Sequence, residues 1–88
     1  MEKFTENDIY IVRFANKLTD GTIDDFDIVV IGERNAHKHF DVVCEANKEE
    51  DSLIGIRLYK GKLFKAFPGC VVDDGDPIRE WKANEKEA

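Results

Sequence analysis

The chain has fewer basic than acidic residues, and it has no long apolar run. Lys and Arg total 13 against 19 Asp and Glu, which gives a formal net charge of −6. Because binding to a phosphate backbone needs a cationic surface, this balance argues against nucleic acid as a partner. No stretch approaches the roughly 18 consecutive apolar residues of a membrane span, and the first residues lack the apolar core of a signal peptide. We therefore expect a cytoplasmic protein that does not bind membranes.

Cysteine pairs and catalytic motifs are absent as well. The two cysteines, Cys44 and Cys70, lie far apart and form no C-x-x-C pair, so neither a disulfide framework nor a zinc knuckle is predicted. The sequence contains no glycine-rich phosphate loop, no G-x-S-x-G and no H-E-x-x-H. A chain of 88 residues also has little room for a water-excluding pocket. These absences predict a protein that is not an enzyme and needs no cofactor or metal.

Two segments near the N-terminus have the composition of paired strands. Residues 9–15 and 26–31 are β-branched and aromatic, and Asp20-Gly21 lies between them with the chemistry of a tight turn. A two-residue turn at this point would place Lys17 opposite Asp24 and Val12 opposite Val29. The pattern predicts an antiparallel hairpin.

A second hairpin is predicted around Lys60-Gly61, between residues 53–59 and 62–67. Its alternation divides the side chains between two faces. The face expected in the core carries Ile54, Ile56, Leu58, Leu63 and Phe67, and the opposite face carries Arg57, Tyr59, Lys62 and Phe64.

Residues 34–50, between the hairpins, fit either a helix or a strand, because apolar residues recur at both spacings. Their length and their Ala, Glu and Lys content favour a helix, with Asn35 as its N-cap. Asp76 and Pro77 predict the start of a short C-terminal helix that carries Ile78 and Trp81. The expected fold is a single α+β domain over residues 1–88, with an antiparallel sheet from two hairpins, a helix between them and a short C-terminal helix.

The first hairpin is apolar on both sides. The predicted register places Ile11, Ala15, Phe26, Ile28 and Val30 on one face and Tyr10, Val12, Phe14, Val29 and Ile31 on the other. One helix cannot cover both faces. The second face is therefore expected to meet the C-terminal helix, a second copy of the chain or a target protein.

Acidic residues supply the main candidate for a functional surface. They form three clusters: Asp20, Asp24, Asp25 and Asp27; Glu49, Glu50 and Asp51; and Asp73 and Asp74, followed by Asp76. Spaced carboxylates of this kind can imitate a phosphate backbone and occupy a basic groove, or they can simply keep a small protein soluble. The favoured hypothesis is a small acidic protein-binding module, an inhibitor or adaptor of the phage or bacterial kind, whose partner has a basic surface.

Three alternatives use other residues. The aromatic and cationic set Arg57, Tyr59, Lys62 and Phe64 is a second candidate partner face. A homodimeric structural or regulatory subunit would associate through its sheet. A metal-dependent enzyme would use His37, His39 and Asp41, which share one face of a strand, whereas a helix keeps only His37 and Asp41 together.

Overall fold

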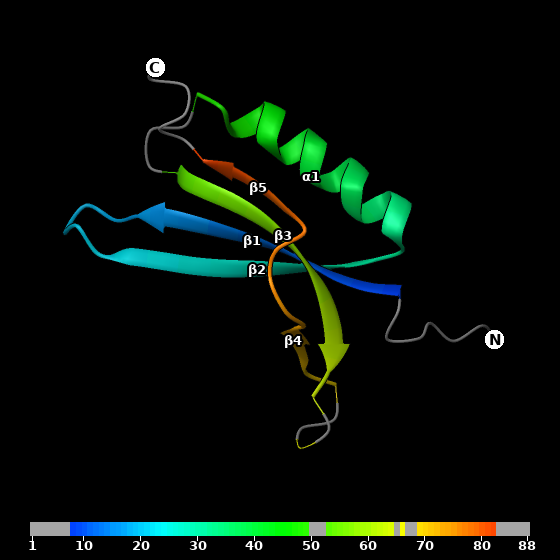
Figure 1. The fold of residues 1–88 in the computed structure, drawn as a ribbon. Helices are drawn as coiled ribbons and strands as arrows, with labels where there is room; N and C mark the ends of the chain where they lie inside the picture. The colour runs from blue at the N-terminus through cyan, green and yellow to red at the C-terminus, as the bar shows by residue number, and fades with distance from the viewer. Residues whose placement is uncertain (1–7, 50–52, 65, 67–68, 83–88) are drawn as a thin grey trace.

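The first hairpin is present, with a helix after it and three further strands. The computed structural model describes residues 8–49, 53–64, 66 and 69–82 (Figure 1). In chain order these residues form the elements β1 (Ile9–Lys17), β2 (Ile23–Ile31), α1 (Glu33–Asn47), β3 (Leu53–Leu63), β4 (Val71–Asp73) and β5 (Arg79–Lys82). The strands make one curled antiparallel sheet in the order β2-β1-β3-β4, in which β5 also pairs with β3. The small α+β domain is thus confirmed. None of the described residues belongs to a helix that is long and apolar enough to cross a lipid bilayer.

The register of the first hairpin differs by one residue from the predicted one. Val12 lies opposite Ile28, and Lys17 lies opposite Ile23. A two-residue type I′ turn needs positive φ at both central residues, but in the Asp20-Gly21 pair only Gly21 has it, at 90°. The strands are instead joined by residues 18–22, across which the Leu18 amide donates to the Thr22 carbonyl at 2.8 Å. The predicted pairs Lys17–Asp24 and Val12–Val29 are therefore wrong.

Because a slip of one residue exchanges the faces of a strand, the predicted grouping of the two strands is also wrong. The face under α1 carries Tyr10, Val12 and Phe14 of β1 and, opposite them, Val30, Ile28 and Phe26 of β2. The outer face carries Ile11 and Ala15 of β1 opposite Val29 and Asp25 of β2.

Residues 33–47 form the predicted helix, and Ala36 and Phe40 are its buried residues. The predicted N-cap is wrong. The helix is preceded by Gly32, with φ at 96°, and the Asn35 amide lies in the first turn, where it donates to the Ile31 carbonyl at 3.2 Å. The strand therefore passes directly into the helix through a glycine that tolerates positive φ.

The predicted second hairpin is wrong, because β3 is one continuous strand that runs through Lys60 and Gly61. Gly61 does not have the positive φ that a tight turn would need. A Cβ on Gly61 would lie 2.9 Å from Cγ2 of Ile9 and 3.1 Å from Cγ1 of Val71. The glycine therefore allows close packing between strands. Of the five residues predicted for the core face, Ile56 and Leu58 are buried, Ile54 and Leu63 are exposed, and Phe67 lies outside the described residues.

The C-terminal helix predicted after Asp76 and Pro77 is replaced by β5 within the described residues. Trp81 lies opposite Ile56 of β3 and packs against the core cluster. The free edge of β3 supplies backbone partners, and tertiary pairing overrides the local start signal.

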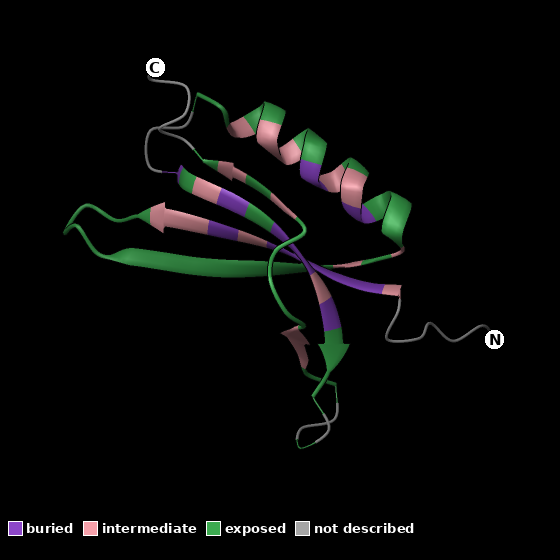
Figure 2. Ribbon diagram, in the orientation of Figure 1, coloured by how far each residue is buried: buried purple, intermediate pink, exposed green. Residues whose placement is uncertain are grey.

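The second face of the sheet is covered unevenly. Ile9, Ile11 and Tyr59 are buried on it, where the end of β3 curls and β4 lies against β1. In contrast, β2 remains exposed along nearly its whole length (Figure 2). The covering element is β4, a strand of the sheet itself, and it leaves the side chains of β2 largely exposed.

Candidate partner-binding edge

Arg13 neutralises carboxylates from two of the predicted acidic clusters. Its guanidinium donates to both carboxylate oxygens of Asp27 on β2, at 2.8 and 3.1 Å, and to Asp73 on β4 at 3.3 Å. The hydrogen bond to Asp27 is the main reason why the pKa of Arg13 lies above its ordinary value. Asp74 lies 3.7 Å from the ammonium group of Lys62. Asp27, Asp73 and Asp74 therefore serve the fold, and their charge is partly cancelled.

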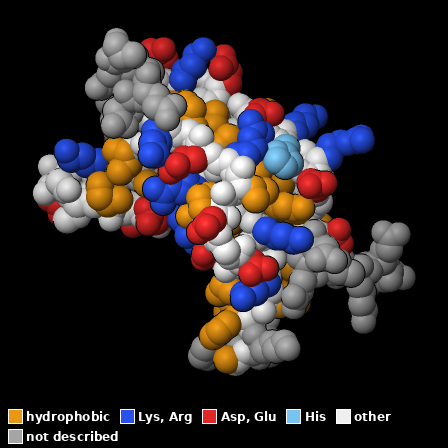
Figure 3. Space-filling model, in the orientation of Figure 1, with side chains coloured by type: hydrophobic (Ala, Val, Ile, Leu, Met, Phe, Trp, Pro, Cys, Tyr) orange, Lys and Arg blue, Asp and Glu red, His pale blue; other side chains and the backbone are white. Residues whose placement is uncertain are grey.

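The other acidic candidates do not form one surface with these. Asp20 accepts hydrogen bonds from the hydroxyl and amide of Thr22 at 2.7 and 3.0 Å, and these bonds hold the pKa of its carboxyl below the ordinary value. Asp24 projects from β2 on the side of α1, whereas Asp25 projects from the outer face. Glu49 is exposed after the helix, and Glu50 and Asp51 lie outside the described residues. On the face seen in Figure 3, acidic and basic side chains are interspersed.

The four residues of the alternative partner face do not share one face, because β3 continues where the turn was predicted. Arg57 and Tyr59 project from the outer face of β3, Lys62 projects from the opposite face, and Phe64 follows the end of the strand. Tyr59 is only 7% exposed and lies under the guanidinium of Arg13, 4.8 Å from the ring centroid. Arg57 donates to Glu80 at 2.7 Å, which lowers the pKa of that carboxyl. No continuous cationic and aromatic platform is formed by these side chains.

The helix brings His37 and Asp41 together, and both contact Arg79 of β5. The guanidinium donates to Asp41 at 2.7 Å, lies 3.3 Å from Nδ1 of His37 and stacks over the ring of Phe40, 4.5 Å from its centroid. His39 projects elsewhere, and its Nε2 is buried without a hydrogen-bond partner in the described part of the chain. No three His, Cys, Asp or Glu side chains of the described residues gather as metal ligands. The contacts of Arg79 therefore hold β5 against α1.

Strand β2 lies at the edge of the sheet and is exposed along nearly all of its nine residues, and the sequence did not predict this edge position. Apolar side chains project from both of its faces, and Ile23, Phe26 and Val29 are 53%, 48% and 49% exposed. Two further exposed apolar residues, Ile28 and Ile31, lie on the same strand. Among the described residues only β1 pairs with β2, so its other side is open.

Two hydrogen bonds outside the ladder show which backbone groups of β2 face outward. The Leu18 amide donates to Thr22, and the Gly32 amide donates to Asp8 at 2.6 Å, so the residue pairs at both ends of the hairpin are of the hydrogen-bonded type. Because such pairs alternate along an antiparallel ladder, the even-numbered residues of β2 bond to β1. The amides and carbonyls that point away from the sheet belong to Ile23, Asp25, Asp27, Val29 and Ile31.

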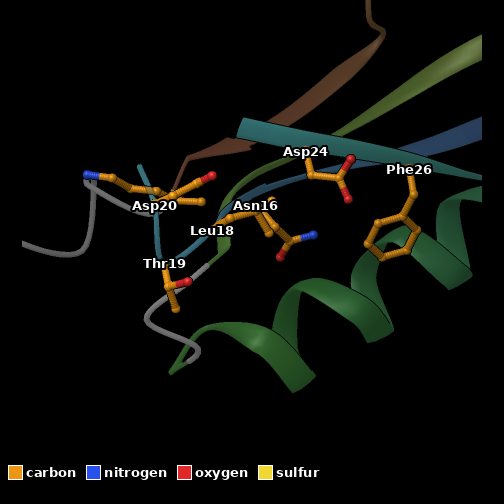
Figure 4. A pocket seen from close by; sticks show the side chains of 7 residues that line it. Asn16, Leu18, Thr19, Asp20, Asp24 and Phe26 are labelled. Carbon is orange, nitrogen blue, oxygen red and sulfur yellow. The ribbon is translucent and has the colours of Figure 1, made fainter. Parts of the chain in front are cut away.

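A shallow, open hollow extends this edge at the tip of the hairpin. It is lined by Asn16, Lys17, Leu18, Thr19, Asp20, Asp24 and Phe26. Figure 4 shows Asp24 and Phe26 projecting from β2 on the side of α1. The Phe26 ring stacks on Phe14, with centroids 4.8 Å apart, which fixes its orientation although nearly half of the residue is exposed. Strand β2 and this hollow together present an exposed apolar surface next to the carboxylates of Asp20 and Asp24.

No family model, curated protein or solved structure matches this chain, so its function has to be inferred from the arrangement of its own residues.

Proposed function

We propose that the protein is a small non-enzymatic protein-binding module that accepts an extended segment of a partner as an additional strand on β2. The observation that carries this proposal is the nine-residue edge strand, exposed on both faces, with unpaired backbone groups along its open side among the described residues. A long apolar edge of this kind is a template for strand addition, and natural proteins usually protect such edges.

The acidic residues support a preference for partners with basic side chains. Asp24 and Asp25 are exposed at the first half of the edge and form no hydrogen bond or ion pair with another described side chain. A Lys or Arg on the incoming strand would meet these carboxylates across the ladder. Since Arg13 and Lys62 already partly neutralise Asp27, Asp73 and Asp74, exposed charge is expected to steer association more than to dominate affinity.

A displayed library of random peptides tests this function without knowledge of the natural partner. Selection on the protein should enrich extended sequences in which apolar residues alternate with Lys or Arg. Proline at position 29 should abolish binding, because the Val29 amide faces outward and is needed by an added strand but not by β1. Val29→Lys should also weaken binding, because it places a positive charge in the apolar second half of the edge.

The control is Val42→Lys, which charges a similarly exposed valine on α1. It should leave peptide binding unchanged. Enriched peptides that bind Val29→Pro as tightly as the wild type would show that the edge is not the binding site, and the proposal would then be rejected.

A further inference from the structure

We infer that the strand that β2 accepts is the β2 of a second copy, paired antiparallel about Ile28, so that one sheet continues through two molecules. This inference rests on the proposed role of β2 as a strand-accepting edge. It adds the identity of the partner and the register of pairing. Because β2 carries no Lys or Arg, the preference for basic side chains proposed above belongs to a different protein, which would compete with the second copy for the same edge.

The division of charge along β2 favours this partner. The first half of the strand carries Asp24, Asp25 and Asp27, whereas residues 28–31 are all aliphatic. Antiparallel self-pairing brings the first half of one strand opposite the second half of the other. A parallel arrangement in register would instead place each carboxylate beside its own copy, where like charges are destabilising.

Geometry restricts the registers that two identical strands can adopt. A two-fold axis perpendicular to the sheet keeps each side chain on the same face in both copies, and opposite residues share a face. The axis therefore passes midway between one residue and the same residue of the second copy. Centring on Phe26 would oppose Asp25 with Asp27, and centring on Asp27 would oppose two Asp27 carboxylates.

Centring on Ile28 removes these oppositions. Asp25 then faces Ile31 of the second copy, and Asp27 faces Val29 of the second copy, so no carboxylate opposes another along residues 25–31. Asp24 faces Gly32 of the second copy, which has no side chain, and its carboxylate stays in water. Centring on Val29 would also separate the carboxylates, but it shortens the overlap to residues 27–31.

The same register fits the backbone and the exposed apolar side chains. The pairs Asp25–Ile31 and Asp27–Val29 join residues whose amides and carbonyls face outward, so each pair can exchange both ladder hydrogen bonds. On the face beside α1, Phe26 would lie opposite Val30 of the second copy, and Ile28 would lie opposite Ile28. The apolar side chains that α1 leaves exposed would thereby be covered.

Disulfide trapping reads this register directly. In a Cys70→Ser background, which removes the exposed native thiol, Ile28→Cys should form a disulfide-linked dimer under mild air oxidation. The two Ile28 positions make a non-hydrogen-bonded pair with Cα atoms about 4.5 Å apart, which is within the range of a disulfide. Phe26→Cys and Val30→Cys should each fail to cross-link alone, because each lies about 14 Å along the ladder from its own copy. A mixture of these two variants should give the heterodimer.

Light scattering coupled to size-exclusion chromatography supplies the second readout. We expect the wild type and Val42→Lys to have the mass of a dimer, and Val29→Pro to have the mass of a monomer. Trapping through Asp27→Cys in preference to Ile28→Cys would overturn the register. A dimer that survives Val29→Pro would overturn the proposed interface.

A wild type that stays monomeric at the highest soluble concentration would overturn self-pairing. Peptide selection separates that failure from a failure of the proposed function. A monomer that binds extended peptides and loses them in Val29→Pro retains the strand-accepting function with another protein as its partner. A monomer whose peptide binding ignores Val29→Pro refutes both.

Discussion

Replacing Arg13 by methionine tests whether one side chain joins the three strands that surround it. Arg13 of β1 donates to Asp27 of β2 and Asp73 of β4, and its guanidinium lies over Tyr59 of β3. Methionine keeps most of the aliphatic length but removes the charge and the donors. The change therefore isolates the polar contacts from the packing of the side-chain stem.

The expected loss follows from the exposure of each contact. The Arg13 side chain is 25% exposed and that of Asp27 is 38% exposed, so their bidentate pair belongs at the upper end of surface ion pairs, about 1 kcal/mol. The single contact with Asp73, at 3.3 Å and 41% exposure of its partner, should add about 0.3 kcal/mol. Stacking over buried Tyr59 should add roughly 0.5 to 1 kcal/mol. Arg13→Met should thus lower the free energy of unfolding by about 2 kcal/mol.

Urea unfolding and thermal melting measure this loss. For a domain of this size, about 2 kcal/mol corresponds to a decrease in Tm of roughly 8 to 16 °C. Part of the difference should disappear in high salt, because screening weakens the ion pairs in the wild type. Asp27→Asn should reproduce more of the loss than Asp73→Asn, since it removes the closer and bidentate contact.

Arg57→Met is the matched control. Arg57 lies directly opposite Arg13 on the outer face, but its side chain is 50% exposed and it pairs with the single carboxylate of Glu80. Its replacement should cost only about 0.5 kcal/mol. If Arg13→Met were no more destabilising than Arg57→Met at low salt, the assignment of Arg13 as the link between the three strands would be refuted.

Local composition predicted the first hairpin and the helix that follows it, because each depends on neighbouring residues. It did not predict the hairpin register, which differed by one residue. Only Gly21 of the Asp20-Gly21 pair adopts positive φ, and Asp20 instead bonds to Thr22, so the connection is a longer loop. The correct register pairs Arg13 with Asp27, a charge match that is better than the Lys17–Asp24 pair on which the prediction relied.

The errors after residue 53 have a different cause. A glycine after Lys60 has the local signature of a turn, and only the long-range approach of Ile9 and Val71 shows that Gly61 is needed for packing. Trp81 follows Ile78 at helical spacing, yet pairing with β3 gives this segment a strand. Both choices depend on contacts between segments far apart in the chain, which propensity does not encode.

The candidate site could be predicted only in part for the same reason. The sequence indicated that both sides of the first hairpin are apolar and that aspartates lie on it, but which strand forms the edge follows from the order of the whole sheet. The sequence also did not predict that Arg13 donates hydrogen bonds to Asp27 and Asp73, which belong to different acidic clusters. The pairing of Arg13 with an aspartate in the hairpin was the available signal, and the wrong register concealed it.

Three further predictions concern the packing of the core and its thiols. Gly61→Ala should cost about 1 to 3 kcal/mol in urea unfolding, because its Cβ would crowd Ile9 and Val71; a change within 0.5 kcal/mol of zero would contradict that packing. Trp81→Ala should cost about 2 kcal/mol, less than for a fully buried tryptophan, and native emission should lie between the buried and exposed limits; fully exposed emission would show that β5 does not dock. The third prediction contrasts the two thiols: burial raises the pKa of Cys44 to about 11, whereas Cys70 is exposed. Thiolate is the reactive form, so at pH 8 Cys44 should react with a disulfide reagent at least about tenfold more slowly than Cys70. As the pH rises above the ordinary thiol value, the unfolded chain loses the Cys44 proton before the folded protein does, so folding stability should fall between about pH 9 and 11, and less so in Cys44→Ala. Equal labelling rates for the two thiols in native protein, with both rates matching those in urea, would show that Cys44 is not buried against the sheet.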